Sequence, residues 1–382
     1  MNSSATGLMP FQAMEMAAHA KALEADGRII CHLEAGEPAA PPAPKVIAAA
    51  AEALHRPQPY THSMGRTELR RALSRYYDEQ HGVGIDPDSI VVTMGSSAGF
   101  ILAFLAGFEP GAAIAVTRPG YPAYLNTLAA LNFRAVEIPL HAANGWRLTA
   151  ADIAAAHARE RFDGLLFASP ANPTGASVDR GELAEIVGVC ARLGIRLISD
   201  EIYHGLDYRG PSVSAAELTP DAIVINSFSK YFCMTGWRVG WIVMPADLIR
   251  RTVMMQQSLF IAAPTLGQIA AEVALGERDY YDVERARYRH NGEVLGAGLS
   301  TLGFSGVRRP DGAFYAYVDV SKFSNDSMQF CRELLDVAGV CTTPGIDFDR
   351  VDGQKFVRLS YAGSQATIEE ALQRIGTFLD RR

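Results

Sequence analysis

One lysine stands in a short segment that combines a nucleophile with groups able to hold an anion. Residues 227–238 read Ser-Phe-Ser-Lys-Tyr-Phe-Cys-Met-Thr-Gly-Trp-Arg, with Lys230 in fourth place. The segment follows an apolar run whose length and β-branched content are typical of a buried strand. Because open α/β sheets carry their chemistry at the carboxyl ends of strands, Lys230 is placed to capture a carbonyl. Ser227, Ser229 and Arg238 can hold a phosphate beside it, a combination that favours pyridoxal phosphate. The alternative is a solvated loop lysine.

Such a cofactor also needs an acid for its pyridine nitrogen and donors for its ring hydroxyl. Asp200 ends a predicted strand, 196–199, and could keep that nitrogen protonated, although a helix N-cap or turn residue is the alternative. Asn172 follows another apolar run within Asn-Pro-Thr-Gly, which is also ordinary turn chemistry. The amide of Asn172, with Tyr203 as a second donor, could bind the ring oxygen.

The phosphate and the ring of the cofactor need further contacts. Gly95, Ser96 and Ser97 lie between a predicted strand and a predicted helix, where backbone N–H groups and hydroxyls bind anions. A serine N-cap is the alternative for these residues and is compatible with anion binding. Tyr121 follows a strand and could stack on the ring, although a core tyrosine at a turn fits the sequence equally well.

A second arginine stands where a charge is costly. Arg358 lies in the apolar run 356–361, and a buried charge needs a partner. A substrate carboxylate held by two parallel hydrogen bonds would supply that partner, and so would a structural salt bridge. Gly36 could let a backbone N–H approach the same carboxylate, because glycine permits close approach.

The elements that must position these residues alternate along the middle of the chain. Strands are expected at 90–93, 113–117, 135–138, 164–168, 196–199, 222–226 and 239–243, with helices at 97–107, 121–131 and 180–193. This alternation predicts an α/β fold, in which a mainly parallel sheet forms the middle of three α/β/α layers. The later strands 312–319 and 355–361 and helices 325–339 and 367–379 predict a smaller α+β domain. The expected division is an N-terminal segment 1–45 packing with the small domain, a large domain 46–285 and a small C-terminal domain 286–382.

Composition narrows the class of protein. The 382 residues carry a net charge of -7, which argues against a nucleic-acid partner and against an anionic membrane surface. The first 27 residues lack the pattern of a signal peptide, and the five cysteines are scattered without a CxxC pair. A cytoplasmic protein with reduced thiols is therefore expected, and no cluster has the spacing of a metal site.

The order of these motifs resembles the class I/II aminotransferases, which are fold-type I pyridoxal-phosphate enzymes. The resemblance covers nearly the whole chain from about residue 14. It rests on Gly36-Glu-Pro, Tyr60 with Gly65, Gly95-Ser-Ser, Pro119-Gly-Tyr, Asn172-Pro-Thr-Gly, Asp200-Glu-Ile-Tyr, Ser227-Phe-Ser-Lys, Gly236-Trp-Arg and Arg358-Leu-Ser.

The resemblance implies an activity and a role for each matching residue. Lys230 would carry the cofactor as a Schiff base, and a ping-pong mechanism would move an amino group between an L-amino acid and a 2-oxo acid. The cofactor would contact Gly95, Ser96, Ser97, Tyr121, Asn172, Asp200, Tyr203, Ser227, Ser229 and Arg238, and the substrate would contact Gly36, Asn172 and Arg358. Tyr60 matches a tyrosine that reaches the phosphate of a neighbouring subunit, which implies a homodimer with shared active sites.

Some questions stay open at this level. A carbon–sulfur β-lyase shares the same scaffold and site, and a pyridoxal-phosphate-binding regulator is a more distant alternative. Many relatives have glycine where this chain has Asp349, so the loop near the substrate is expected to differ. Relatives specific for dicarboxylates often place a basic residue at the position of Ser96 or Ser97, and its absence here argues against a dedicated aspartate substrate. A small or hydrophobic amino acid is favoured by the mostly apolar character of the residues expected near the substrate, which are Met14, His62, Ser63, Met64, Phe260 and Phe348.

Overall fold

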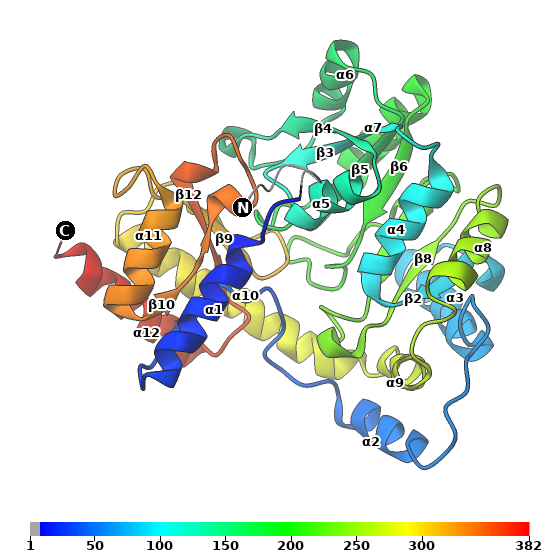
Figure 1. Ribbon diagram of the computed structural model, residues 1–382, viewed down its shortest axis with the longest axis horizontal. Helices are drawn as coiled ribbons and strands as arrows, with labels where there is room; N and C mark the ends of the chain where they lie inside the picture. The colour runs from blue at the N-terminus through cyan, green and yellow to red at the C-terminus, as the bar shows by residue number, and fades with distance from the viewer. Residues whose placement is uncertain (1–7, 382) are drawn as a thin grey trace.

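The computed structural model describes residues 8–381, and a seven-stranded sheet forms its centre (Figure 1). The strand order is β2-β8-β7-β6-β5-β3-β4. These strands are β2 (Ile90–Thr93), β3 (Ala113–Arg118), β4 (Arg134–Pro139), β5 (Gly164–Ala168), β6 (Arg196–Asp200), β7 (Ile223–Ser227) and β8 (Gly240–Val243). Only β8 runs antiparallel to its neighbours, so the carboxyl ends of the other six gather at one edge.

Both faces of this sheet are covered by helices, which explains why its strands are apolar at successive positions. On β3, Ile114 and Val116 belong to one buried cluster, whereas Ala113 and Ala115 belong to the other. One face packs against α4 (Gly95–Gly107), α5 (Pro122–Ala130) and α8 (Ile249–Leu259). The other face packs against α3 (Thr67–His81), α6 (Ala150–Arg159), α7 (Arg180–Leu193) and α9 (Thr265–Ala274), and α2 (Pro44–Ala53) lies against α9. The expected three-layer α/β fold with a mainly parallel sheet is confirmed.

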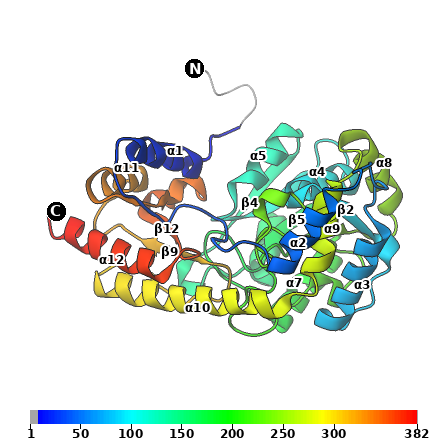
Figure 2. The ribbon, with the colours of Figure 1, turned by 90° about the horizontal axis from the view of Figure 1, so that it is seen from below.

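A smaller sheet is built from the later part of the chain. Antiparallel strands pair in the order β11-β12-β9, with β9 at Tyr315–Asp319, β11 at Thr343–Pro344 and β12 at Phe356–Ser360. The N-terminal strand β1 (Cys31–His32) pairs with β10 (Val340–Cys341). Figure 2 shows α1 (Gln12–Ala25) and α11 (Ser327–Glu333) on one side of β9 and β12, and α10 (Arg278–Thr301) and α12 (Gln365–Leu379) on the other.

Differences from the sequence-based expectation are local. The helix expected at 325–339 is α11 followed by a π-helical turn at Leu334–Ala338. The expected domain boundary at 285/286 falls within the continuous helix α10, and the division into domains remains a proposal. No helix within residues 8–381 is long and apolar enough to cross a membrane.

A buried tryptophan ties the main sheet to the loop that carries Lys230. Trp241 on β8 is fully buried, and its Nε1 donates a hydrogen bond of 3.1 Å to the hydroxyl of Tyr77 on α3. Its ring lies 5.0 Å from the ring of Phe228, which stands two residues before Lys230. The indole therefore supports both α3 and the loop that carries Lys230.

We expect Trp241→Ala to lower the free energy of unfolding by about 3–5 kcal/mol, because the cavity left by an indole cannot close. The urea denaturation midpoint of the cofactor-free protein measures this. Val283→Ala is the matched control, since Val283 is 68% exposed and its truncation should leave the midpoint nearly unchanged. Equal midpoints for the two variants would contradict this account of the core.

Candidate active site

A cavity of about 710 Å³ opens at the edge where the parallel strands end. Segments after β2, β3, β5, β6 and β7 reach it, together with the N-terminal segment and strands β9 and β12. Most of the residues singled out from the sequence line it: Gly36, Ser96, Ser97, Tyr121, Asn172, Asp200, Tyr203, Ser229, Lys230, Arg238 and Arg358. Gly95, Ser227 and Tyr60 do not line it and are described below.

Lys230 extends into this cavity three residues after the end of β7. Its Nζ donates a hydrogen bond of 2.6 Å to the backbone carbonyl of Gly36. Burial lowers the pKa of Lys230 to about 8, and the nearby guanidinium groups of Arg358 and Arg238 act in the same direction. The amine is therefore easier to deprotonate than an exposed lysine, which is the property that a nucleophilic lysine needs.

Asp200 at the end of β6 presents a buried carboxylate to the cavity. Its Oδ1 accepts a hydrogen bond of 3.1 Å from the N–H of Ile202, and its Oδ2 accepts one from the hydroxyl of Tyr124. Burial raises the pKa of Asp200 to about 6, although these two donors oppose the rise. The hydrogen bond from Ile202 is the contact expected of a turn residue. The buried carboxylate also leaves a negative charge that a cationic atom of a ligand would stabilise.

The N-terminus of α4 forms one wall of the cavity. The helix begins at Gly95 without a side-chain cap, so its first N–H groups have no side-chain acceptor. A Cβ atom at Gly95, where φ is +72°, would lie 2.5 Å from Nη2 of Arg238. Glycine therefore lets the guanidinium pack directly on the helix start, which concentrates positive potential there.

Ser227 supports this wall from behind. Its Oγ lies 2.9 Å from Oγ of Ser229 and 3.1 Å from the carbonyl of Val239, and it accepts a hydrogen bond from the N–H of Ser229. Ser229 itself lines the cavity. The position of Ser227 therefore fits orientation of the Ser229 hydroxyl rather than contact with a ligand.

Asn172 and Tyr203 are linked to the smaller sheet. The hydroxyl of Tyr203 lies 2.7 Å from that of Tyr315 on β9. The Oδ1 atom of Asn172 accepts a hydrogen bond of 3.0 Å from Nη1 of Arg358 on β12. The two strands of the smaller sheet thus complete a site that starts at the edge of the main sheet.

Arg358 is buried, and residues 8–381 provide no counter-charge for it. Its Nη2 donates to the carbonyl of Glu34 at 2.6 Å and to Oγ1 of Thr343 at 3.2 Å. Its guanidinium carbon lies 4.5 Å from the ring centre of Tyr315 and 4.8 Å from that of Phe348. No carboxylate within residues 8–381 lies within 4 Å of the guanidinium, so the structural salt bridge allowed by the sequence is not formed. A buried and oriented cation of this kind fits a ligand carboxylate.

The two remaining tyrosines differ in their surroundings. Tyr121 lines the cavity, is 36% exposed and stacks on Phe11 at 6.3 Å between ring centres, so it is not a core tyrosine. Tyr60 is 81% exposed and lies away from this cavity. Any contact of Tyr60 with a cofactor would have to be with that of another subunit.

Several residues at the site were not singled out from the sequence. Tyr124 donates a hydrogen bond to Asp200, and the hydroxyl of Tyr315 lies beside that of Tyr203. Two further carboxylates line the cavity, those of Glu34 and Glu37. Tyr124 follows Tyr121 by three positions at the start of a helix, a spacing that could have indicated a shared face. Nothing in the sequence indicated Tyr315, because Tyr317 on the same strand β9 is also a tyrosine and only the packing of the strand shows which of them reaches Tyr203.

Asp349 has a structural role. Its Oδ1 accepts hydrogen bonds from the N–H groups of Val351 at 2.8 Å and Asp352 at 3.0 Å. The same oxygen lies 3.3 Å from Nε of Arg118 at the end of β3. The carboxylate therefore closes its own loop and joins that loop to the main sheet.

The site fits pyridoxal phosphate on three observations. The uncapped start of α4 and Arg238 provide N–H donors and positive charge for a phosphate. Asp200 provides a buried carboxylate for a pyridine nitrogen, and Lys230 provides an amine of lowered pKa for a carbonyl carbon. All three groups line one cavity.

Comparisons with known proteins agree with this reading. Residues 28–375 match the family model described as aminotransferase class I and II. The chain is 43% identical over 378 residues to a valine–pyruvate aminotransferase of Mycobacterium tuberculosis, covering 98% of this chain and 97% of that protein. It is 31% identical over 374 residues to an aspartate/prephenate aminotransferase of Thermus thermophilus, covering 96% of each.

Solved structures show the same relationship. The crystal structure of an aminotransferase from Mycobacterium tuberculosis superposes with a TM-score of 0.95 at 42% identity, covering 100% of both chains. That of the Thermus thermophilus aspartate aminotransferase with maleate superposes with a TM-score of 0.91 at 30% identity, covering 97% of both. Members of the matched family use pyridoxal phosphate. The chain belongs to the class I and II aminotransferases and is a pyridoxal-phosphate-dependent enzyme that moves amino groups between amino acids and 2-oxo acids.

Proposed function

We propose that this aminotransferase takes the amino group of a neutral aliphatic amino acid such as valine and gives it to pyruvate. The observation that carries the proposal is the distribution of positive charge in the cavity. Its basic lining residues are Lys21, His32, Lys230, Arg238 and Arg358. Since Lys230 and Arg238 serve the cofactor in this proposal, Arg358 is the one buried cation left for a substrate carboxylate.

The other two basic groups do not suit a second carboxylate. Nδ1 of His32 lies 2.8 Å from Glu34, and Nε2 lies 3.1 Å from Glu24, so both ring nitrogens are engaged. Lys21 is exposed at the rim. A dicarboxylate would therefore bring its second charge to a site without a free buried cation, which is costly.

Apolar side chains line the part of the cavity contributed by the N-terminal segment. Phe11, Ala13, Met14 and Ala17 come from this segment, and Phe348 comes from the loop after β11. These side chains suit an aliphatic substrate side chain. The printed name of the 43% identical relative, a valine–pyruvate aminotransferase, supports the same substrate pair.

The proposed roles of the site residues follow from their contacts. Lys230 would bind the cofactor covalently through Nζ, and Asp200 would pair with the pyridine nitrogen. The phosphate would be held by Gly95, Ser96, Ser97, Ser229 and Arg238, with Ser227 orienting Ser229. Tyr121 would stack on the ring, Asn172 and Tyr203 would reach the ring oxygen, and Arg358 with Gly36 would bind the substrate carboxylate.

The proposed chemistry depends on the α-proton of the substrate, which Lys230 moves, and on the charge of Arg358, which orients the substrate. When bound, pyridoxal phosphate supplies an electron sink that stabilises negative charge at the α-carbon of the substrate. Nζ of Lys230, once free, would take the α-proton from the substrate and deliver a proton to the carbonyl-derived carbon of the cofactor, which is the carbon that receives the amino group. A pKa of about 8 suits such transfer near neutral pH. Arg358 would hold the α-carboxylate so that the α-proton faces this amine.

A homodimer in the cytoplasm is part of the proposal. Tyr60 would reach the phosphate site of a second subunit, and its ring is 81% exposed in the single chain. Ile261 and Leu54 are also large exposed apolar side chains, at 49% and 65%. The five cysteines are free and buried, which suits a reducing compartment.

The proposed donor can be tested with single amino acids in the absence of any oxo acid. Valine, alanine and leucine should bleach the visible band of the holoenzyme and release a stoichiometric 2-oxo acid, whereas aspartate should react at least about tenfold more slowly for want of a second buried cation. Faster reaction with aspartate or glutamate would overturn the neutral donor. Catalytic release of ammonia without bleaching would instead reveal the β-lyase reaction.

The pKa of Lys230 gives a pH test of its role. Because burial lowers this pKa from 10.5 to about 8, the neutral amine is available at lower pH than in an exposed lysine. The rate at which cofactor-free enzyme binds pyridoxal phosphate covalently should therefore rise with pH and reach half its maximum near pH 8. Stopped-flow absorbance measures this rate. Lys230→Ala should abolish covalent binding of pyridoxal phosphate. Lys355→Ala is the control, because Lys355 is exposed and its loss should leave covalent binding intact. Covalent binding by Lys230→Ala would refute the assignment.

The role of Arg358 is tested by removing its charge. Arg358→Gln should lower kcat/KM for the amino acid by about ten- to a hundredfold, the loss expected for a charge-assisted carboxylate contact. The affinity for pyridoxal phosphate should change little, since that contact lies elsewhere. Arg350→Gln is the control, because Arg350 is exposed on the neighbouring loop. Unchanged steady-state kinetics in Arg358→Gln would show that the carboxylate binds at another group.

A further inference from the structure

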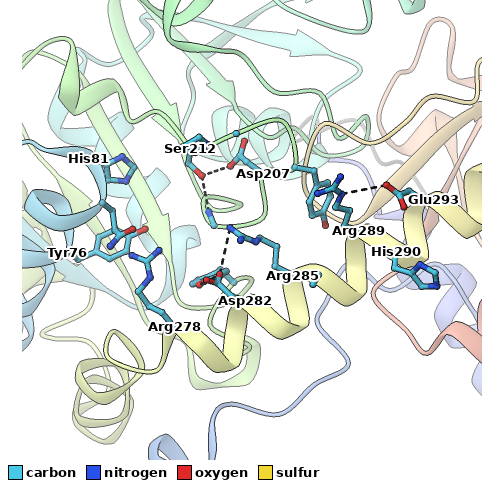
Figure 3. A pocket seen from close by; sticks show the side chains of 17 residues that line it. Tyr76, His81, Asp207, Ser212, Arg278, Asp282, Arg285, Arg289, His290 and Glu293 are labelled. Carbon is cyan, nitrogen blue, oxygen red and sulfur yellow. Dashed lines mark hydrogen bonds and ion pairs between the residues drawn. The ribbon is translucent and has the colours of Figure 1, made fainter.

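A second cavity, of about 820 Å³, shares no lining residue with the catalytic cavity. One wall is a stripe of α10 that presents Arg278, Asp282, Arg285, Arg289 and Glu293 (Figure 3). The opposite walls come from the C-terminal half of α3 and from the loop 205–212. The spacing of four, three, four and four residues places these α10 side chains on one face of the helix.

The lining of this cavity carries both signs of charge. Arg278, Arg285 and Arg289 are balanced by the carboxylates of Asp207, Asp282 and Glu293. Burial raises the pKa of Asp207 to about 7, so near neutral pH these six side chains together carry between zero and one positive charge. A multiply charged anion therefore meets the carboxylates of Asp282 and Glu293, and part of the time that of Asp207, as well as the three guanidinium groups. A ligand that carries both signs is a better electrostatic match.

The charges are not evenly paired along the cavity. Arg289 and Glu293 lie 3.5 Å apart at one end, and Arg285 lies 3.7 Å from Asp282 in the middle. At the other end, beside Tyr76, the guanidinium of Arg278 makes no hydrogen bond or ion pair with any residue of 8–381 (Figure 3). One unpaired cation thus stands one helical turn from a carboxylate that is shared between Arg285 and the hydroxyl of Tyr231.

From this arrangement we propose that the second cavity binds a free α-amino acid. Arg278 takes the carboxylate of the ligand, and Asp282, one turn further along α10, takes its ammonium group. The rings of Tyr76, Tyr208 and Tyr231 line the same space and suit an apolar or aromatic side chain. Inorganic phosphate fits less well, because it has no cationic group to set against Asp282.

Two consecutive residues, Lys230 and Tyr231, line the two different cavities. Lys230 extends into the catalytic cavity, and Tyr231 extends into the second one, where its hydroxyl donates 2.7 Å to Oδ1 of Asp282. An ammonium group at Asp282 would compete with this hydrogen bond and so bear on the reactive loop. The N–H of Tyr208 also donates to the carbonyl of Asp311, in the segment that leads to β9 and Tyr315. A ligand in the second cavity would therefore contact the loop of Lys230 and could change the rate of amino transfer.

Equilibrium dialysis of the intact enzyme tests the proposal. The enzyme is first converted to its amino form with excess donor and freed of oxo acid, so that further binding of labelled L-phenylalanine or L-valine consumes no cofactor. Arg278→Gln should weaken binding at least about tenfold, as expected for the loss of a charge-assisted partner. Asp282→Asn should weaken binding of the amino acids without weakening that of phosphate.

Two controls separate this site from the catalytic one. Arg289→Gln alters the end of the same cavity where the guanidinium has a partner, and it should change affinity by less than about threefold. Arg358→Gln removes the proposed carboxylate contact of the catalytic pocket and should leave the second site intact. Binding lost in Arg358→Gln but kept in Arg278→Gln would overturn the proposal, as would tighter binding of phosphate than of either amino acid.

Discussion

The buried guanidinium of Arg358 is the constraint on which this structure depends. A buried charge without a counter-ion is costly, and the protein reduces that cost with two carbonyl or amide oxygens, one hydroxyl and two aromatic rings rather than with a carboxylate. The contacts hold the group in place and leave its charge uncompensated. A ligand carboxylate can then stabilise the guanidinium charge that the protein itself does not neutralise. A buried, uncompensated cation therefore favours binding of such a ligand.

The same principle governs the rest of the catalytic cavity. The start of α4 offers N–H groups without a side-chain acceptor, Asp200 offers a carboxylate without a cation, and Lys230 offers an amine whose protonation burial disfavours. Each group is oriented by neighbours that do not neutralise it. The parallel sheet makes this possible, because it brings several strand ends and one helix start to a single edge while helices exclude water from both faces.

The smaller sheet supplies what the main sheet lacks. Arg358 and Tyr315 come from β12 and β9, and they meet Asn172 and Tyr203 from the main sheet. The N-terminal segment passes between these parts, where Gly36 accepts from Lys230 and its Cα faces the hydroxyl of Tyr315, 2.7 Å from where a Cβ would stand. Three parts of the chain far apart in sequence therefore define the space available to a substrate.

The sequence by itself determined the fold class and the residues available for chemistry. Period and composition predicted the strands of the main sheet closely. Polar residues at or soon after the ends of those strands indicated Lys230, Asp200 and Asn172, because parallel strands end at one edge. Only the tertiary structure decided which side chains face the cavity. The structure placed Ser227 behind Ser229 and outside the cavity lining. It showed that Asp349 bonds to its own loop and to Arg118. It also showed contacts of Tyr124 and Tyr315 at the site. Within residues 8–381 it also gave Arg358 no carboxylate partner. The sequence could not decide this, since the contacts of Arg358 with Asn172 and Glu34 span 186 and 324 positions. Local pattern fixes which element a residue occupies, whereas packing between distant elements fixes what its side chain meets.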